Sequence, residues 1–179
     1  SKGLAAPYRQ RNLLYCNLGN GTFDDVTSVA GPGLRLERSG RGVAFADFDE
    51  DGDVDLVINN QNDLPTLLRN DGGNRNNFIQ VRTIGTRSNH DGIGARVSIL
   101  VNGRRQVDEV RSGGSYLSQS DLCLHFGIGE AREVEEIEVR WPGGARDRLT
   151  NVSANQRVFI EEGKGLIRAV SLPGGKPQK

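Results

Sequence analysis

Apolar and polar residues alternate most regularly over 133–141. Ile137, Val139 and Trp141 occupy every second position there, and charged residues stand between them. A period of two is typical of a β-strand with one face in a core and the other in water. The stretch therefore predicts a strand that buries these three side chains.

Similar short segments fill the rest of the second half of the chain. Residues 95–101 alternate in the same way, and Asn102-Gly103 is a dipeptide typical of a tight hairpin, so 104–110 is expected to pair back on them. Further strands are expected at 78–84, 122–126, 133–141, 146–149 and 157–161. Strands at this spacing, joined by glycine-rich turns, predict a small β-sandwich or barrel.

The first half predicts a separate set of short strands. They are expected at 11–18, 22–26, 42–48, 55–60 and 66–70. Gly19-Asn20-Gly21 joins the first two as a hairpin. The polar, glycine-rich stretch DGGNRNN at 71–77 marks a boundary. The chain therefore divides into a polar tail at 1–10, a first module at 11–72, a second module at 77–162 and a frayed tail at 163–179.

Five aspartates alternate between two of the expected strands, in the stretch DFDEDGDVD. They are Asp47, Asp49, Asp51, Asp53 and Asp55. Carboxylates this close repel one another unless a cation draws them together, and Ca²⁺ takes about 6–8 oxygen ligands from carboxylates, carbonyls and water. Gly52 stands where a tight loop needs a residue that tolerates positive φ. The stretch predicts a calcium-binding loop, and an acidic turn without an ion is the alternative.

The ligands follow from the spacing. The first half of the stretch fits the calcium loop of EF-hand proteins, but the position of the closing glutamate falls on Ile58, and the flanks suit strands rather than helices. We therefore expect a shorter loop closed by Asp55, with Phe48 and Val54 turned toward a core. Side-chain ligands are expected from Asp47, Asp49, Asp51 and Asp55, and a backbone carbonyl from Asp53. The role of the ion is expected to be structural, because the loop supplies most of its ligands.

Several segments resemble known families. GRGVAFADFDEDGDVDLVINN resembles an FG-GAP (VCBS-type) β-propeller repeat with a DxDxDGxxD calcium loop, and RNLLYCNLGNGTFDDVTSVAG resembles the strand pair before such a loop. Residues 77–162 resemble an ASPIC/UnbV domain in IGARVSILVNG, SGGSYLSQSD, LHFGIG and VEEIEVRWPGG. The whole is similar to the C-terminal part of the cartilage acidic protein family and its bacterial relatives. The resemblance implies an all-β fold, partial propeller blades followed by a small sandwich or barrel, and adhesion or matrix interaction.

A propeller blade has about four strands. The resemblance implies that the first module supplies the last two strands of one blade and the beginning of the next. The chain is therefore expected to be the C-terminal piece of a longer protein. Exposed strand edges pair with other chains, so we expect them to be covered by the second module or by a second copy of the chain.

Charge and hydropathy narrow the choice of partners. The chain has 23 lysines and arginines against 23 aspartates and glutamates, so no net field attracts nucleic acid or anionic lipid. It has no apolar run long enough to span a membrane and no apolar leader at its start. We expect an extracellular or periplasmic protein that binds a protein or a glycan.

The two cysteines, Cys16 and Cys123, lie in different modules. They are interpreted as independent buried thiols, and a disulfide between them is the alternative. Asn20 and Asn151 begin N-x-S/T triplets, which are glycosylation acceptors only in a secreted protein of a eukaryote.

Candidate catalytic groups are few. His90 lies beside Asp91 in an expected loop and His125 lies between apolar neighbours on an expected strand, so both are interpreted as structural or solvated residues. The serine-rich stretch at 112–120 contains no nucleophile motif. The sequence favours a calcium-stabilised binding or adhesion module. The alternative is an accessory or catalytic domain of a secreted hydrolase or carbohydrate-active enzyme.

Overall fold

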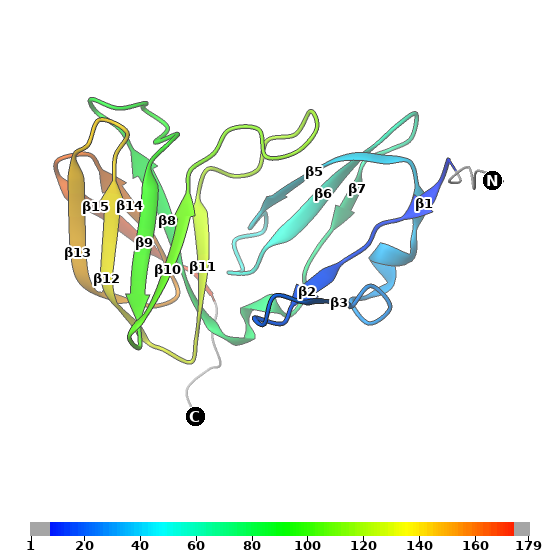
Figure 1. Cartoon of the computed structure of the whole chain (residues 1–179), viewed down its shortest axis with the longest axis horizontal. Helices are drawn as coiled ribbons and strands as arrows, with labels where there is room; N and C mark the ends of the chain where they lie inside the picture. The colour runs from blue at the N-terminus through cyan, green and yellow to red at the C-terminus, as the bar shows by residue number, and fades with distance from the viewer. Residues whose placement is uncertain (1–7, 174–179) are drawn as a thin grey trace.

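The computed structural model describes residues 8–173. Within that range the chain folds into β-strands and two short 3-10 helices, so the all-β prediction is confirmed. The two halves of the chain lie side by side along the long axis of the molecule (Figure 1). Most of the predicted tail at 1–10 lies outside the described residues.

The first module consists of three small sheets. The first pairs β1 (Gln10–Arg11) with β4 (Glu37–Arg38), and the second is the hairpin of β2 (Tyr15–Asn17) and β3 (Phe23–Asp25). The third has the order β5-β6-β7, from β5 (Gly40–Ala46), β6 (Asp55–Asn60) and β7 (Thr66–Leu68). The 3-10 helix η1 (Pro32–Arg35) precedes β4, and η2 (Gly73–Arg75) leads into the second module.

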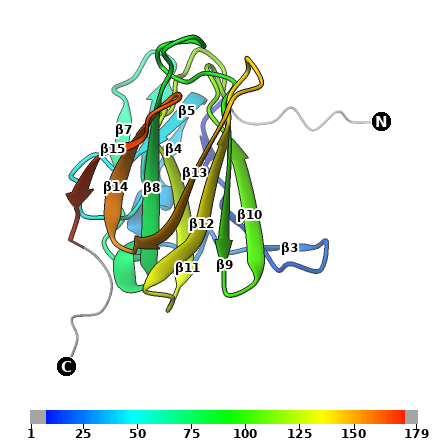
Figure 2. The ribbon, with the colours of Figure 1, turned by 90° about the vertical axis from the view of Figure 1, so that its left-hand side faces the viewer.

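The second module is a sandwich of two open four-stranded sheets (Figure 2). The outer sheet has the order β10-β9-β12-β13, from β9 (Arg96–Val101), β10 (Arg104–Glu109), β12 (Glu133–Arg140) and β13 (Arg146–Ser153). The inner sheet, which faces the first module, has the order β11-β8-β14-β15, from β8 (Asn77–Ile84), β11 (Leu124–Gly129), β14 (Gln156–Glu161) and β15 (Gly165–Ser171). The pairing of β14 with β8 is parallel, and the others are antiparallel.

The hydrophobic core lies between the two sheets of the second module. Ile137 and Val139 on β12 are fully buried, and Trp141 just after it is 1% exposed, as their alternation predicts. The indole Nε1 of Trp141 donates a hydrogen bond of 2.7 Å to Oδ2 of Asp147. A buried indole N–H needs such an acceptor. Asp147 supplies it, so the ring of Trp141 packs in the core without leaving its polar atom unpaired.

The prediction of a frayed tail at 163–179 is wrong for the residues of β15. Gly165–Ser171 forms an antiparallel ladder with β14 and completes the inner sheet. Its side chains are mostly exposed, so it lacks the alternation by which the other strands were predicted. The backbone hydrogen bonds to β14 hold it instead.

The second module covers one edge of the first. The serine-rich loop between β10 and β11 lies along β5, where the backbone N–H groups of Val43 and Phe45 donate to Oγ of Ser115 and Ser120 at 3.3 Å each. The N–H of Asp121 donates to the carbonyl of Phe45 at 2.9 Å. An uncovered strand edge invites pairing with other chains, so this loop protects β5 in the manner expected of the second module.

No helix in the part of the chain that the structure describes has the length and apolar character that crossing a membrane requires.

Candidate metal centre

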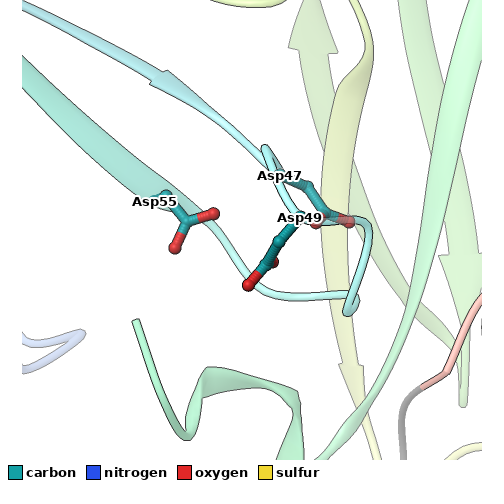
Figure 3. A group of neighbouring side chains, drawn as sticks. All are labelled: Asp47, Asp49 and Asp55. Atoms are coloured by element: carbon teal, nitrogen blue, oxygen red, sulfur yellow. The ribbon is translucent and has the colours of Figure 1, made fainter. Parts of the chain in front are cut away.

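The loop between β5 and β6 brings three of the predicted ligands together. Carboxylate oxygens of Asp47, Asp49 and Asp55 all lie within 4.8 Å of one another (Figure 3). Two oxygens bound to one Ca²⁺ lie at most about 5 Å apart, twice the Ca–O distance. The spacing of the three carboxylates therefore meets the limit that a shared calcium ion sets, and the remaining positions of such an ion would be filled by backbone carbonyls and water.

Asp47 shapes the loop as well as contributing to the cluster. Its two carboxylate oxygens accept hydrogen bonds of 3.1 Å from the backbone N–H groups of Asp51 and Gly52. These contacts fold the chain back over Asp47, and the backbone between them takes positive φ, 59° at Glu50 and 94° at Gly52. Gly52 tolerates that conformation without steric cost, as its place in the sequence predicts.

Asp55 is fixed from two sides. One carboxylate oxygen accepts the N–H of Phe48 at 3.1 Å, and the other accepts the N–H of Asn70 at 2.8 Å. The residue is 2% exposed. Asp49 is exposed, so the centre has a buried wall formed by Asp55 and an open side formed by Asp49.

Asp51 and Asp53 lie outside this cluster of three. The carboxylate of Asp51 accepts the N–H of Asp53 at 3.1 Å and faces Nδ2 of Asn74 at 3.2 Å. The carboxylate ligand from Asp51 and the carbonyl ligand from Asp53 stay predictions.

The side chain of Asp53 has an environment that the sequence did not indicate. It is 2% exposed, and its Oδ2 accepts the N–H of Gly73 at 2.9 Å. Its Oδ1 has no hydrogen-bond partner among the described residues. Burial, and then the charge of Asp51, raise the pKa of this carboxyl. A buried carboxylate oxygen without a donor is costly, so a cation in this loop would lower the cost of the charge on Asp53.

The expected packing of Phe48 is wrong. Phe48 is 58% exposed, and Val54 is half-buried. Hydrogen bonds to the carboxylates hold the loop, and one of its close contacts with the second module is at Gly52, where an added Cβ would overlap the ring of Phe78. The loop therefore needs no aromatic anchor of its own.

The remaining candidate residues do not belong to the cluster of three carboxylates. The side chain of His90 is 86% exposed. His125 stacks on Phe78, with ring centroids 5.2 Å apart, and burial lowers its pKa. Cys16 and Cys123 are both free; Cys16 is exposed, so its predicted burial is wrong. Cys123 is half-buried, and burial raises its pKa to about 12.

Comparison with known families agrees with these two modules. The family model described as FG-GAP-like repeat matches residues 4–58, which include the whole acidic loop. The model described as ASPIC and UnbV matches residues 85–167, which include most of the sandwich. The chain carries an FG-GAP-like repeat followed by an ASPIC/UnbV domain.

The chain is also similar to proteins called Cartilage acidic protein 1. It is 41% identical over 75 residues to the one from Xenopus tropicalis, a match that covers 42% of this chain and 11% of that protein. It is 51% identical over 51 residues to the one from Mus musculus, and 49% identical over 51 residues to the one from Homo sapiens. Each of these covers 28% of this chain and 8% of the relative. The matches thus span only a small part of the relatives' length.

The second module supplies contacts to the acidic loop that sequence reasoning missed. Gln80 on β8 donates from Nε2 to Oδ2 of Asp47 at 2.6 Å. Oε1 of Gln80 accepts Nε of Arg157 at 2.7 Å, and Nη1 of Arg157 reaches Oε1 of Glu50 at 2.9 Å. Gln80 is 2% exposed although it points away from the sandwich core. A glutamine within the apolar run FIQVRTI was the available signal, but it names no partner.

Proposed function

We propose that this chain is a calcium-stabilised binding or adhesion module of an extracellular protein. The observation that supports it is the cluster of Asp47, Asp49 and Asp55, whose oxygens lie within the reach of one calcium ion. The hydrogen bond from Gln80 to Asp47 attaches this cluster to the ASPIC/UnbV domain. Calcium bound here would lock the loop in shape and strengthen the contact between the two modules.

The chemistry of the site supports an extracellular setting. Hard carboxylate ligands suit Ca²⁺, and extracellular calcium modules work with dissociation constants of about 10⁻⁴–10⁻³ M. The cluster has one exposed side at Asp49, which leaves coordination positions for water and favours such a modest affinity. A protein or glycan ligand would then bind to surfaces that the ion holds in place.

Exposed apolar residues on the β5-β6-β7 sheet support the proposal that the first module is part of a propeller. Val57 and Leu67 are directly opposite each other on β6 and β7, and both are exposed. Val43 and Phe45 on β5 lie on the other face of the same sheet and are also exposed. Apolar residues on both faces of a sheet require cover on both sides, and a propeller blade has a neighbouring blade on each side. We infer that β5-β6-β7 belongs to one blade and the β2-β3 hairpin to the blade before it.

A thermal melt with calcium and then with excess chelator tests the proposal. A ligand that binds only the folded state stabilises it by about 2.7 kcal/mol at 100 times its Kd. We expect calcium to raise the melting temperature, and magnesium at the same concentration to raise it less because Mg²⁺ sheds its water reluctantly. Identical melts under all three conditions would leave the stretch 47–55 as an acidic turn.

A further inference from the structure

Three arginines stand side by side across the exposed face of the outer sheet. Arg140 on β12 is directly opposite Arg96 on β9 and directly opposite Arg146 at the start of β13. All three are exposed, and Arg96 and Arg140 each stand between two buried residues of the core. Strands β9, β12 and β13 are neighbours in the outer sheet (Figure 2).

The charges on this face do not balance. The face carries a shallow hollow of about 310 Å³, whose lining includes five arginines and two glutamates, a formal excess of three positive charges. Glu138 pairs with Arg148 at 2.8 Å and with Arg146 at 3.4 Å, and Glu136 pairs with Arg105 at 3.2 Å. The two glutamates are therefore already engaged.

Arg96 and Arg140 carry two of the three excess charges. Neither forms an ion pair or a side-chain hydrogen bond within residues 8–173. Glu109 lies opposite Arg96 on the edge strand β10, but it makes no ion pair with Arg96. Like charges directly opposite each other destabilise an antiparallel sheet. The neighbouring row on the same face has no such repulsion. There Glu138 lies between Ser98 and Arg148, so opposite charges face each other.

We propose that this arginine row (Arg96, Arg140 and Arg146) binds a linear polysaccharide that carries sulfate groups. Adjacent strands lie about 4.8 Å apart, so the three guanidinium groups are spread over roughly 10 Å across the sheet. Guanidinium groups are planar forks that bind oxyanions through paired hydrogen bonds. A chain with repeated anionic groups would cross the strands and neutralise several arginines at once.

The surface around the row favours a polysaccharide over a nucleic acid. Single-stranded nucleic acids bind to aromatic side chains on which their bases stack, and the lining of this hollow contains no aromatic residue. The chain as a whole has no net charge, so an anionic polymer would be attracted by a local cluster of arginines such as this one. The inference names a ligand class for the binding module proposed above. It does not depend on calcium, because the row lies on the outer sheet and the acidic loop contacts the inner one.

Calorimetric titration of the whole chain with a size-defined heparin oligosaccharide tests the inference, in calcium and again in chelator. The matched variants are Arg140→Thr and, as control, Arg104→Thr, an exposed arginine at the end of β10 outside the hollow. We expect saturable binding that weakens as salt rises. We expect Arg140→Thr to weaken it about tenfold, because a charge-assisted hydrogen bond is lost, and Arg104→Thr to leave it nearly unchanged.

A second measurement separates binding from folding. Without oligosaccharide and at low salt, Arg140→Thr is expected to raise the melting temperature, because it removes the repulsion in the row. Equal loss of binding in both variants, or no binding by the natural chain, would overturn the inference. Single-stranded DNA of similar length and charge that bound as tightly would also overturn it. Binding that persists in chelator while calcium fails to shift the melt would reject the calcium proposal alone.

Discussion

The side-chain amide of Gln80 donates a 2.6 Å hydrogen bond to the carboxylate of Asp47 and so joins the second module to the acidic loop. The same carboxylate oxygen accepts the backbone N–H of Gly52, which shapes the loop. Asp47 thus serves the loop, the proposed ion and the neighbouring domain together. A substitution in the loop, loss of the ion or loss of the contact with the second module is therefore expected to alter the other two.

Replacing Gln80 with alanine is expected to lower the free energy of unfolding by about 2 kcal/mol, because a buried amide that bonds both Asp47 and Arg157 is removed. Gln156→Ala is the matched control, since that amide bonds only the nearby carbonyl of Ser153, and we expect it to cost less than about 0.5 kcal/mol. Urea unfolding with and without calcium measures both. Equal losses for the two variants would show that the contact between the modules contributes nothing special.

Removal of calcium is expected to loosen both sides of the contact. Chelator should speed amide hydrogen exchange in residues 47–54 and in β8 around Gln80, because local opening of the loop releases the amide that holds it. The amides of β9 and β12 in the outer sheet should keep their protection. Hydrogen exchange followed by mass spectrometry resolves these segments. Faster exchange confined to the loop, with β8 unchanged, would contradict the coupling.

Gly52→Ala is expected to destabilise the chain more than its backbone angle alone requires. The residue has φ of 94°, and an added Cβ would also overlap the ring of Phe78. Gly21→Ala is the control, because Gly21 has φ of 86° and nothing within 4 Å of the position of an added Cβ. We expect about 1 kcal/mol for the control and about 2–4 kcal/mol for Gly52→Ala. Equal values from thermal melts would mean that the loop moves away from Phe78 freely.

The carboxylate of Glu162 is expected to make part of the stability depend on pH. The backbone N–H groups of Ser88, Arg87 and Thr86 donate to it, with that of Ser88 the strongest cause, and they lower its pKa to about 2. A carboxyl whose pKa is lower in the folded state stabilises fully above its unfolded pKa, near 4.5, and this stability is lost as the pH falls toward 2.

Glu162→Gln removes that contribution, so its melting temperature should lie below that of the natural chain at pH 7 and approach it at pH 3. Glu135→Gln is the control, because Glu135 is exposed on β12 and has no partner within the described range. It should follow the natural chain at both pH values. A constant difference for Glu162→Gln between pH 7 and pH 3 would show that its ionisation is irrelevant.

The elements that the sequence predicted best are those whose surroundings determine a regular pattern of residue types along the element itself. Ile137 and Val139 alternate with charge because one face of β12 meets the core, and the alternating aspartates mark the loop in which three carboxylates come together. β15 was missed because both its faces are largely exposed. Gln80 was missed because its contact joins residues 33 positions apart. Phe48 was misplaced because the loop is held by carboxylates rather than by an apolar anchor.

Calorimetric titration with calcium tests the central claim most directly. The natural chain should bind one calcium ion at the cluster, and Asp49→Asn should bind it at least about tenfold more weakly, since Asp49 is one of three carboxylates around the ion. Asp24→Asn, an exposed aspartate on β3 far from the cluster in the chain, should bind as the natural chain does. No calcium-dependent heat from the natural chain, or the same affinity for Asp49→Asn, would contradict a calcium centre at Asp47, Asp49 and Asp55.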